Sequence, residues 1–339
     1  MKQYNVAVIG CGAVSKNHGK ALAQNPQTTI RYAVDIDRSQ AERFAATYGG
    51  TVLTDYRELF SKEDVDVVHI VTPHHTHPQI AIDCMHAGLH VFCEKPLAIL
   101  PFDAKRMISA SQETGRRLGV CFQNRMNDAT VRAKAIIDSG EYGAIVSAMV
   151  LVAWDRGGDY YGKSPWRGRY ESEGGGALIN QSIHTLDLLD YLTGGVATVS
   201  GMDAKLREDD AYEVEDFAMF YCSLKRGGRA VGFCTNCYPR SKQCTVEIHL
   251  ERATLTVKQS GLVIEESDGT ERRFDCTVAT GEKSEWGLSH GLLIDAFYRA
   301  LEADSPFIAD AHTALAAVEM VQAIQHSKGR SIEIKGIEQ

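Results

Sequence analysis

This sequence lacks long hydrophobic runs, an excess of basic residues and low-complexity linkers. No stretch approaches the roughly 20 uninterrupted apolar residues that a membrane-spanning helix needs. No signal-peptide pattern precedes the first strand-like run, so we expect a cytoplasmic protein. With 36 Lys plus Arg against 44 Asp plus Glu, the formal net charge is −8, which gives no electrostatic basis for binding nucleic acid or an anionic membrane.

Nine cysteines are present, but their spacing is not that of a disulfide-stapled secreted domain. Reduced thiols in apolar surroundings behave as small hydrophobic side chains, and this favours a reducing compartment. Cys234, Cys237 and Cys244 suggest a zinc site, but their neighbours alternate as in a strand and no second ligand pair follows. We therefore expect core thiols and no metal.

The pattern of the chain changes near residue 122. Before it, short apolar runs alternate with helical segments, which predicts a doubly wound parallel sheet of the α/β class. After it come longer alternating segments that predict a mainly antiparallel open sheet, with strands at Ala144–Ala153, Val214–Leu224, Arg229–Cys237, Cys244–Leu250 and Ala253–Lys258. We therefore expect two domains: an N-terminal doubly wound domain, 1–122, and a C-terminal α+β domain, 123–339, that binds substrate and forms oligomers.

A glycine-rich turn follows the first strand-like run. Gly10-Cys11-Gly12-Ala13-Val14-Ser15 matches the fingerprint of dinucleotide-binding Rossmann domains, with Ser in place of the third glycine. Gly10 permits the tight turn, Gly12 lets the backbone approach a pyrophosphate, and the following helix presents free N–H groups to that anion. We therefore expect Gly10–Val14 to bind a dinucleotide; the alternative is a chance turn.

An acidic residue ends the second predicted strand, as this fold requires. The Asp35 carboxylate is placed to accept hydrogen bonds from the adenosine ribose and would repel a 2′-phosphate, so NAD is favoured over NADP. Arg38 keeps NADP open, because a guanidinium there could stack on adenine or meet a phosphate.

Two further segments leave parallel strands at the edge where such sheets bind ligands. In the first, Thr72, Pro73, His74 and His77 are expected to contact the cofactor rather than a metal, since no acidic residue accompanies them. In the second, Glu94-Lys95-Pro96, a lysine beside an oxidised nicotinamide would have its charged form disfavoured and could help remove a hydroxyl proton. By itself, however, this segment is only a charged turn.

A glycine hinge and a helix follow in the second half of the chain. Asn180, His184 and Asp187 recur at i, i+4 and i+7, so they share one helix face. His184 would then face a site, and Asp187 would orient its ring. The alternative is a structural His–Asp pair.

Three of these motifs carry a resemblance to a known family: the glycine turn at Gly10-Cys11-Gly12, the segment Glu94-Lys95-Pro96, and the glycine hinge with its helix. Together they resemble the glucose–fructose oxidoreductase and inositol dehydrogenase family (Gfo/Idh/MocA), over essentially the whole chain. The resemblance implies that Lys95 and His184 line the nicotinamide end of the cleft, and that Glu94 contacts the cofactor or orients Lys95. It also implies a homodimer or homotetramer built on the open sheet.

Many members of this family carry Asp where this chain has Asn180, and an amide cannot accept a proton. We therefore assign proton transfer to His184, whose reference pKa is about 6.5, assisted by Lys95, with Asn180 positioning the substrate. The expected activity is NAD-dependent oxidation of a secondary hydroxyl, with C3 of a pyranose the leading position. The substrate is expected to be a sugar, glycoside, sugar nucleotide or cyclitol. The alternative is a redox-neutral glycoside-cleaving enzyme that retains its NAD.

Aromatic and basic residues are expected to line the substrate. The candidates are Gln123, Arg125, Trp154, Tyr161, Trp166 and Arg167. An aromatic ring suits the apolar face of a pyranose, and arginine suits its hydroxyls. Trp166 could instead anchor an ordered loop, and Arg125 could brace the domain junction.

Overall fold

The computed structural model describes residues 2–276 and 289–336. The chain divides into two compact units. Unit 1 comprises Met1–Ala98, Phe102–Gln123 and Ser289–Ala314, and unit 2 comprises Ile99–Pro101, Asn124–Leu288 and Leu315–Gln339.

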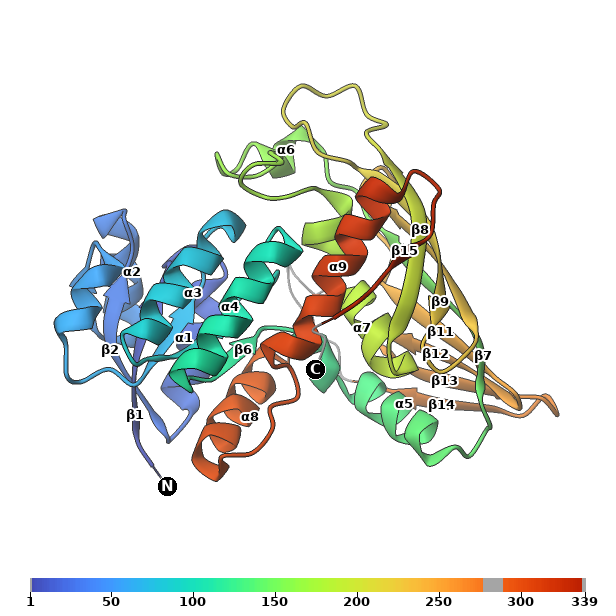
Figure 1. The fold of residues 1–339 in the computed structure, drawn as a ribbon, viewed down its shortest axis with the longest axis horizontal. Helices are drawn as coiled ribbons and strands as arrows, with labels where there is room; N and C mark the ends of the chain where they lie inside the picture. The colour runs from blue at the N-terminus through green and yellow to red at the C-terminus, as the bar shows by residue number, and fades with distance from the viewer. Residues whose placement is uncertain (1, 277–288, 337–339) are drawn as a thin grey trace. The chain divides into compact units, whose positions relative to one another are not determined.

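Unit 1 is built on a six-stranded sheet of order β3-β2-β1-β4-β5-β6, in which every pairing is parallel (Figure 1). Its strands are β1 Tyr4–Ile9, β2 Thr28–Val34, β3 Thr51–Leu53, β4 Val67–Ile70, β5 His90–Cys93 and β6 Leu118–Val120. The central strands are apolar and buried on both faces, as parallel strands under helices must be. The strand order reverses between β1 and β4, and ligands bind at the carboxyl edge of such a switch point.

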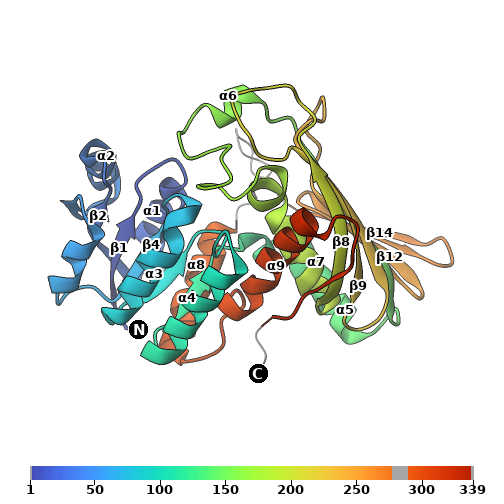
Figure 2. The same ribbon diagram turned by 45° about the horizontal axis from the view of Figure 1, so that its top comes forward.

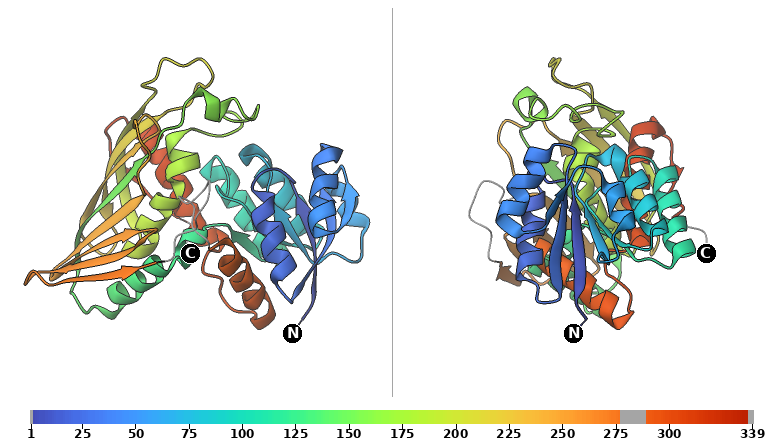
Figure 3. Two further views of the ribbon diagram at one scale, coloured as in Figure 1. Left: turned by 180° about the vertical axis from the view of Figure 1, so that it is seen from behind. Right: turned by 90° about the vertical axis from the view of Figure 1, so that its left-hand side faces the viewer.

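Helices cover both faces of this sheet, as the end-on view in Figure 3 shows. They are α1 Ser15–Gln24, α2 Arg38–Tyr48, α3 His77–His86, α4 Pro101–Thr114 and α8 His290–Ala303. Short 3-10 turns lie at Tyr56–Ser61, His74–Thr76 and Gln123–Met126.

The segment Ser289–Ala314 returns to unit 1, whereas the sequence pattern assigned it to the second domain. Its helix α8 packs against α1, where Asn25 Nδ2 donates a hydrogen bond to Asp295 Oδ1 at 2.7 Å. An amphipathic helix carries no local signal of which distant surface it will cover, so the sequence order alone suggested a simpler division.

Unit 2 contains a nine-stranded sheet of order β14-β13-β12-β11-β7-β10-β9-β8-β15 (Figure 2). Its strands are β7 Ile145–Ala153, β8 Val196–Ala204, β9 Phe217–Leu224, β10 Arg229–Thr235, β11 Thr245–Leu250, β12 Ala253–Lys258, β13 Gly261–Glu266, β14 Glu271–Asp275 and β15 Ile332–Glu333. The neighbours β7 and β10 run parallel, and the other pairings are antiparallel. The expected mainly antiparallel sheet is confirmed.

The helices of unit 2 are α5 Asp128–Ser139, α6 Gly158–Tyr161, α7 Ile183–Thr193 and the greater part of α9 Ala311–Ser327. The helix α7 packs on β7 and β11, and α5 packs on β12 and β13. Large apolar side chains on the sheet remain 40–50% exposed, namely Met149, Met202, Met219, Tyr221 and Val231. Cross-strand pairing joins them, because Val231 lies opposite both Met149 and Tyr221, and Met202 lies opposite Met219.

None of the helices in the described ranges combines the length and the hydropathy that crossing a membrane would require.

Candidate active site

The turn between β1 and α1 has the shape that the glycine motif predicts. Gly10 has φ of +93°, and a Cβ there would lie 2.5 Å from the carbonyl oxygen of Val71, so glycine is needed. A Cβ on Gly12 would meet nothing within 4 Å, so the backbone faces open space. The third motif position, Ser15, is buried and its Oγ donates to Gly12 O at 2.7 Å, closing the turn.

The start of α1 and the end of β2 provide the remaining features of a dinucleotide site. No side chain caps the N-terminus of α1 at Val14, and the N–H groups of Ser15 and Asn17 donate to the carbonyls of Gly12 and Val14, so the partial positive charge of the helix end is what favours an anion there. The Asp35 carboxylate accepts the N–H groups of Cys11 at 2.7 Å and Asp37 at 2.9 Å. A carboxylate has about four lone-pair sites, so Asp35 can also accept ribose hydroxyls. Arg38 is exposed and lies 3.9 Å from Glu42.

His77 joins the two segments that leave β4 and β5. Its ring is fully buried, with Nδ1 at 2.8 Å from Pro96 O and Nε2 at 2.9 Å from Thr72 O. Burial lowers the pKa of His77, while the two carbonyls and Glu94 oppose that shift. The ring therefore braces the backbone around Thr72 and Pro96 and has no nitrogen left for a cofactor. Pro73 precedes the short turn His74–Thr76, in which His74 is buried.

Glu94 and Lys95 are both 7% exposed at the end of β5. Glu94 Oε1 accepts from His18 Nε2 at 2.9 Å, and Oε2 accepts the backbone N–H of Lys95 at 3.2 Å. Burial would raise the pKa of Glu94, but the hydrogen bond from His18 and the nearby His290 and Lys95 side chains outweigh it and hold that pKa well below its usual range. Cys121 Sγ, a ring nitrogen of His18 and a carboxylate oxygen of Glu94 lie within 4.8 Å of one another, as the ligands of a metal ion could. The distance between His18 and Glu94, however, is that of a direct hydrogen bond.

In unit 2 the glycine hinge is built around Glu215, which the sequence reasoning missed. Glu215 Oε1 accepts the N–H groups of Gly176 and Leu178, both at 3.0 Å, at the start of the helical segment. A Cβ on Gly175 would stand 2.9 Å from Glu215 Oε2, so glycine leaves room for the carboxyl group. Complete burial raises the pKa of Glu215 to about 7, although the backbone N–H groups oppose that shift.

The segment after the hinge begins as a π-helix, Ala177–Ser182, and continues as α7. The Asn180 amide donates to the carboxylate of buried Glu173 and, at 3.1 Å, to the hydroxyl of Tyr160. Gln181 Nε2 also donates to that hydroxyl at 3.1 Å. His184 lies in the first turn of α7 and is partly exposed. An amide pair, a phenol and a carboxyl group therefore converge at Asn180 and Gln181, on the helical segment that leads into His184.

Asp187 does not serve His184 in the way the spacing suggested. Its carboxylate accepts from Arg125 Nε at 2.9 Å and from the terminal nitrogen at 2.5 Å, and both side chains are 1% exposed. Burial raises the pKa of Asp187, and the paired Arg125 guanidinium opposes that shift. The i+7 spacing was right for the helix, but it could not show a partner from another segment. Arg125 therefore holds Asp187 in place, and its predicted contact with the substrate stays a prediction.

Three other expected substrate contacts are buried, each with a partner in its own unit. Trp154 Nε1 donates to Lys242 O at 3.1 Å, and the Tyr161 hydroxyl accepts from Asn236 at 2.9 Å while its ring stacks on Tyr212. In unit 1, Gln123 is 1% exposed and receives a weak hydrogen bond from the Cys121 thiol. These contacts show that the three side chains pack inside their own units; their predicted contact with the substrate stays a prediction.

Trp166 and Arg167 remain partly exposed. The Arg167 guanidinium lies 4.6 Å from the ring centroid of Tyr160 and 5.2 Å from that of Trp166, within the range of cation–π attraction. Tyr160, the neighbour of the predicted Tyr161, is therefore the aromatic residue that joins Asn180 and Arg167.

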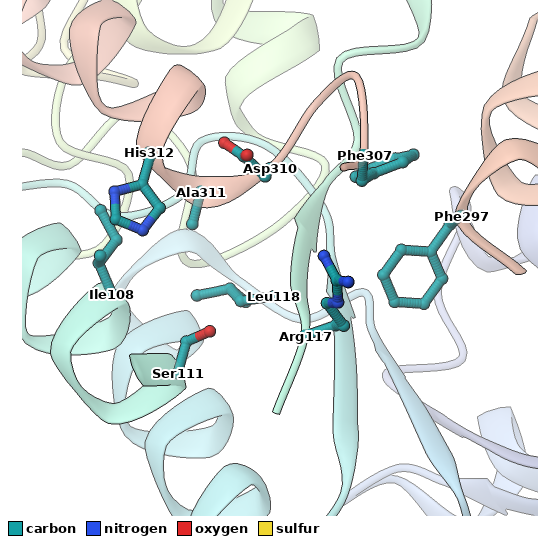
Figure 4. Close-up of a pocket in the computed structure, with 9 residues that line it drawn as sticks. All are labelled: Ile108, Ser111, Arg117, Leu118, Phe297, Phe307, Asp310, Ala311 and His312. Atoms are coloured by element: carbon teal, nitrogen blue, oxygen red, sulfur yellow. The ribbon is translucent and has the colours of Figure 1, made fainter. Parts of the chain in front are cut away.

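A pocket of about 150 Å³ in unit 1 lies at the amino end of β6, away from the carboxyl edge (Figure 4). Its charged side chains have partners within the protein: Arg117 pairs with Asp304 at 2.6 Å, and Asp310 accepts the N–H of Thr313 near the start of α9. Phe297 and Phe307 supply apolar wall. We therefore assign this pocket to packing rather than to catalysis.

The doubly wound sheet, its switch point and its glycine turn define a dinucleotide-binding domain. Residues 4–122 match the model of the oxidoreductase family with an NAD-binding Rossmann fold (Gfo/Idh/MocA), and residues 130–256 match the C-terminal domain model of the same family. The chain belongs to this family, and it is an oxidoreductase that uses NAD.

Three similar proteins illustrate the relationship. Levoglucosan dehydrogenase of Pseudarthrobacter phenanthrenivorans is 28% identical over 322 residues, covering 85% of this chain and 83% of that protein. Inositol 2-dehydrogenase of Salmonella typhimurium is 34% identical over 140 residues, covering 40% of this chain and 42% of that protein. The crystal structure of the WlbA dehydrogenase from Bordetella pertussis, in complex with NADH and UDP-GlcNAcA, superposes with a TM-score of 0.87 at 27% identity and covers 98% of both chains.

Proposed function

We propose that this protein oxidises a secondary hydroxyl on a polyhydroxylated six-membered ring, with C3 of a pyranose as the position attacked. NAD supplies the redox chemistry when bound, by accepting hydride from the substrate C–H bond. His184 takes the hydroxyl proton and Lys95 assists it, so the alcohol becomes a ketone. Glu94 positions Lys95 and does not itself contact the substrate.

The observation that carries the proposal is the polar cluster around Asn180, on the helical segment that continues to His184. Asn180, Gln181, Tyr160 and Glu173 place amide, phenol and carboxyl groups within hydrogen-bonding distance of one another. A ring with several neighbouring hydroxyls is recognised by such a set, because each hydroxyl both donates and accepts. A site for a simple alcohol would need only one or two of these groups.

Within this cluster, Asn180 orients the substrate and does not move a proton. Tyr160 replaces the predicted Tyr161 as the aromatic contact, since Tyr161 is 1% exposed. Arg167, over the Tyr160 ring, contributes donors to ring hydroxyls or to an acidic substituent.

The similar proteins support the same substrate class. Levoglucosan, inositol and the sugar of UDP-GlcNAcA are all six-membered rings with several hydroxyl groups. Their differences in charge and substitution leave the substituents of this protein's substrate to experiment.

We also propose that the exposed apolar face of the nine-stranded sheet joins copies of the chain into a dimer or tetramer. Val231 lies opposite Met149 and Tyr221 on the neighbouring strands, and Met219 lies two residues from Tyr221 on β9. A contiguous exposed apolar patch is typical of an association surface.

The first experiment follows absorbance at 340 nm with NAD and then NADP, against inositols, hexoses, glycosides, sugar phosphates, uronic acids and UDP-sugars. His184→Ala is expected to lower kcat by about 10²–10⁴-fold with the Kd for NAD unchanged. His326→Ala is the matched control, because that histidine lies on α9 in unit 2 and hydrogen-bonds its own helix at Gln322 O. Full activity in His184→Ala would refute the assignment.

A second outcome would favour the redox-neutral alternative. If no substrate produces NADH, and the purified protein carries NAD and releases sugar from a glycoside, then the transient ketone serves bond cleavage rather than net oxidation.

A further inference from the structure

Behind Glu94, unit 1 contains a continuous hydrogen-bonded chain of three buried side chains from three different elements. His18 of α1 contacts His69 of β4 through their Nδ1 atoms at 2.9 Å, and His69 Nε2 contacts the hydroxyl of Tyr298 in α8 at 2.9 Å. At the other end, His18 Nε2 lies 2.9 Å from Glu94 Oε1. All three side chains are fully buried. None of them belongs to the motifs that the sequence analysis singled out.

The positions of the protons in this hydrogen-bonded series follow from the Tyr298 end. Burial raises the pKa of Tyr298 well above its usual value, so Tyr298 keeps its hydroxyl proton. Burial, helped by nearby His18, lowers the pKa of His69 well below its usual value, so His69 is neutral and has one N–H. If Tyr298 donates to His69 Nε2, that N–H must be on Nδ1 and point at His18 Nδ1. His18 then carries its own proton on Nε2 and donates it to Glu94.

This direction satisfies all three contacts with neutral imidazoles and one carboxylate anion. In the reverse direction His18 carries a second proton and donates to His69, and His69 donates to Tyr298. The Tyr298 hydroxyl then no longer donates to His69, and losing a hydrogen bond from a buried hydroxyl is costly. The chain therefore favours one arrangement, in which the donor to Glu94 is always present.

The Glu94 carboxyl group is in turn the acceptor for the backbone N–H of Lys95 at 3.2 Å. The titratable groups around it come from several elements, namely His18 of α1, His77 of α3, His290 of α8, Cys93 of β5, Cys121 after β6 and Lys95 itself. The His18 hydrogen bond lowers the pKa of Glu94 more than any other neighbour does, and the Cys121 thiol also hydrogen-bonds this carboxyl group. His18 is thus the main partner that holds the carboxylate.

We propose that His18 is a positioning residue for Lys95, acting through Glu94, and that His69 and Tyr298 fix the direction of its proton. The catalytic meaning of this role rests on the function proposed above for Lys95. The contacts that position Lys95 are present in the protein without substrate, so they can be tested without it.

The test uses nuclear magnetic resonance of the full chain without NAD, labelled at histidine ring nitrogens, glutamate Cδ and backbone amides. In the unchanged protein we expect His69 protonated on Nδ1, His18 protonated on Nε2 and Glu94 ionised from pH 5 to 9. A doubly protonated His18, or the opposite tautomers, in the neutral range would overturn the proposed direction.

Two substitutions of His18 separate its contacts. In His18→Asn the amide lies near the position of Nδ1, so it reaches His69 but not Glu94. In His18→Gln the amide lies near the position of Nε2 and keeps a donor for Glu94. We expect His18→Asn to raise the titration midpoint of Glu94 by at least about two pH units and to speed exchange of the Lys95 amide about tenfold or more. His18→Gln should change both signals far less.

Tyr298→Phe tests the far end of the chain. Without the hydroxyl, His69 Nε2 has no phenolic donor, so the His69 proton is no longer held on Nδ1 and the ring-nitrogen signals of His69 should show a mixture of the two tautomers. His90→Asn is the matched control, because His90 lies at the other end of β5 and accepts the N–H of Arg117 at 3.0 Å.

The proposal is overturned if Glu94 and the Lys95 amide are unchanged in His18→Asn, or if His90→Asn moves them equally. Because these signals need neither NAD nor sugar, they stand apart from the activity assays. A failed substrate screen with the expected spectra would reject only the proposed function.

Discussion

Each unit contains a buried glutamate next to a segment that we propose for the active site, and the pKa values of the two glutamates are shifted in opposite directions. Glu94 of unit 1 accepts from an imidazole N–H and has histidines and a lysine near it, so its pKa is held well below the usual range despite burial. Glu215 of unit 2 accepts two backbone N–H groups and has no cation among the causes of its shift, so burial raises its pKa to about 7.

The comparison shows that burial alone does not decide the charge of a carboxyl group. Backbone N–H groups orient Glu215 but do not offset the loss of water, whereas charged or ionisable neighbours do so for Glu94. The predicted signs of the pH dependence are therefore opposite in the two units. Asp187 lies between these cases, because Arg125 pairs with it and its pKa still rises.

The largest expected effect comes from breaking the intermediate case. Arg125→Met would leave Asp187 buried without its cation, and removing one partner of a buried pair costs about 3–5 kcal/mol. We expect a loss of that size in the free energy of unfolding, measured by urea denaturation at pH 8. The double variant Arg125→Met/Asp187→Leu should recover most of it. A loss below about 1 kcal/mol in the single variant would show that the pair is solvated.

Glu215→Gln should give the next largest effect, and it should depend on pH. A folded-state pKa raised from 4.5 to about 7 means that the native protein binds more protons than the unfolded chain between those values, so its stability falls as pH rises. Glutamine still accepts the two N–H groups but does not ionise. Relative to the unchanged protein, the variant should therefore gain about 3 kcal/mol between pH 5 and pH 8. Parallel stability profiles over that range would contradict the assignment.

Glu94→Gln should show the opposite dependence. A lowered folded-state pKa contributes stability above the unfolded value, near pH 4.5, and that contribution disappears as pH falls through the folded pKa. We expect the variant to be less stable by about 2 kcal/mol at pH 7, with the difference shrinking on acidification below pH 4.5. The check is urea denaturation from pH 3.5 to 8, and a difference that grows in acid would refute it.

The smallest effect on stability is expected on the outer face of the unit 2 sheet. Met219 is 45% exposed, so Met219→Lys should change the stability of a single copy by less than about 0.5 kcal/mol. If that face joins copies of the chain, the same change should convert the oligomer to a smaller species in light scattering. Leu206→Lys, at a 58% exposed position outside the sheet strands, is the control. An unchanged oligomer would exclude this face as the interface.

Much of unit 1 could be predicted because its signals are local. The turn at Gly10 and Gly12 depends on backbone conformation at single residues, and Asp35 follows directly on its strand. In unit 2, β13 and β14 were missed because their hairpin lies at the end of the sheet, and Glu271–Asp275 is mostly charged.

Candidate site residues could be proposed from the sequence where neighbours in the chain carry the chemistry, as in Glu94-Lys95. Contacts were missed where the partner is distant: Glu94 meets His18 across 76 residues, and Glu215 meets Gly176 across 39. Neither periodicity nor composition reports such pairs. The neighbours Tyr160 and Tyr161 differ for a similar reason, since only packing against Tyr212 shows which ring turns inward.

The return of Ser289–Ala314 to unit 1 also sets an order of events during synthesis. All six strands of the parallel sheet have been made by Val120, yet the helix that covers α1 and supplies Tyr298 begins only at His290. A ribosome therefore releases most of unit 2 before the nascent first unit can be completed. Until then α1 lacks its neighbour and His69 lacks its phenol, so the dinucleotide-binding half, although it comes first in the chain, can be finished only after most of the second unit has emerged.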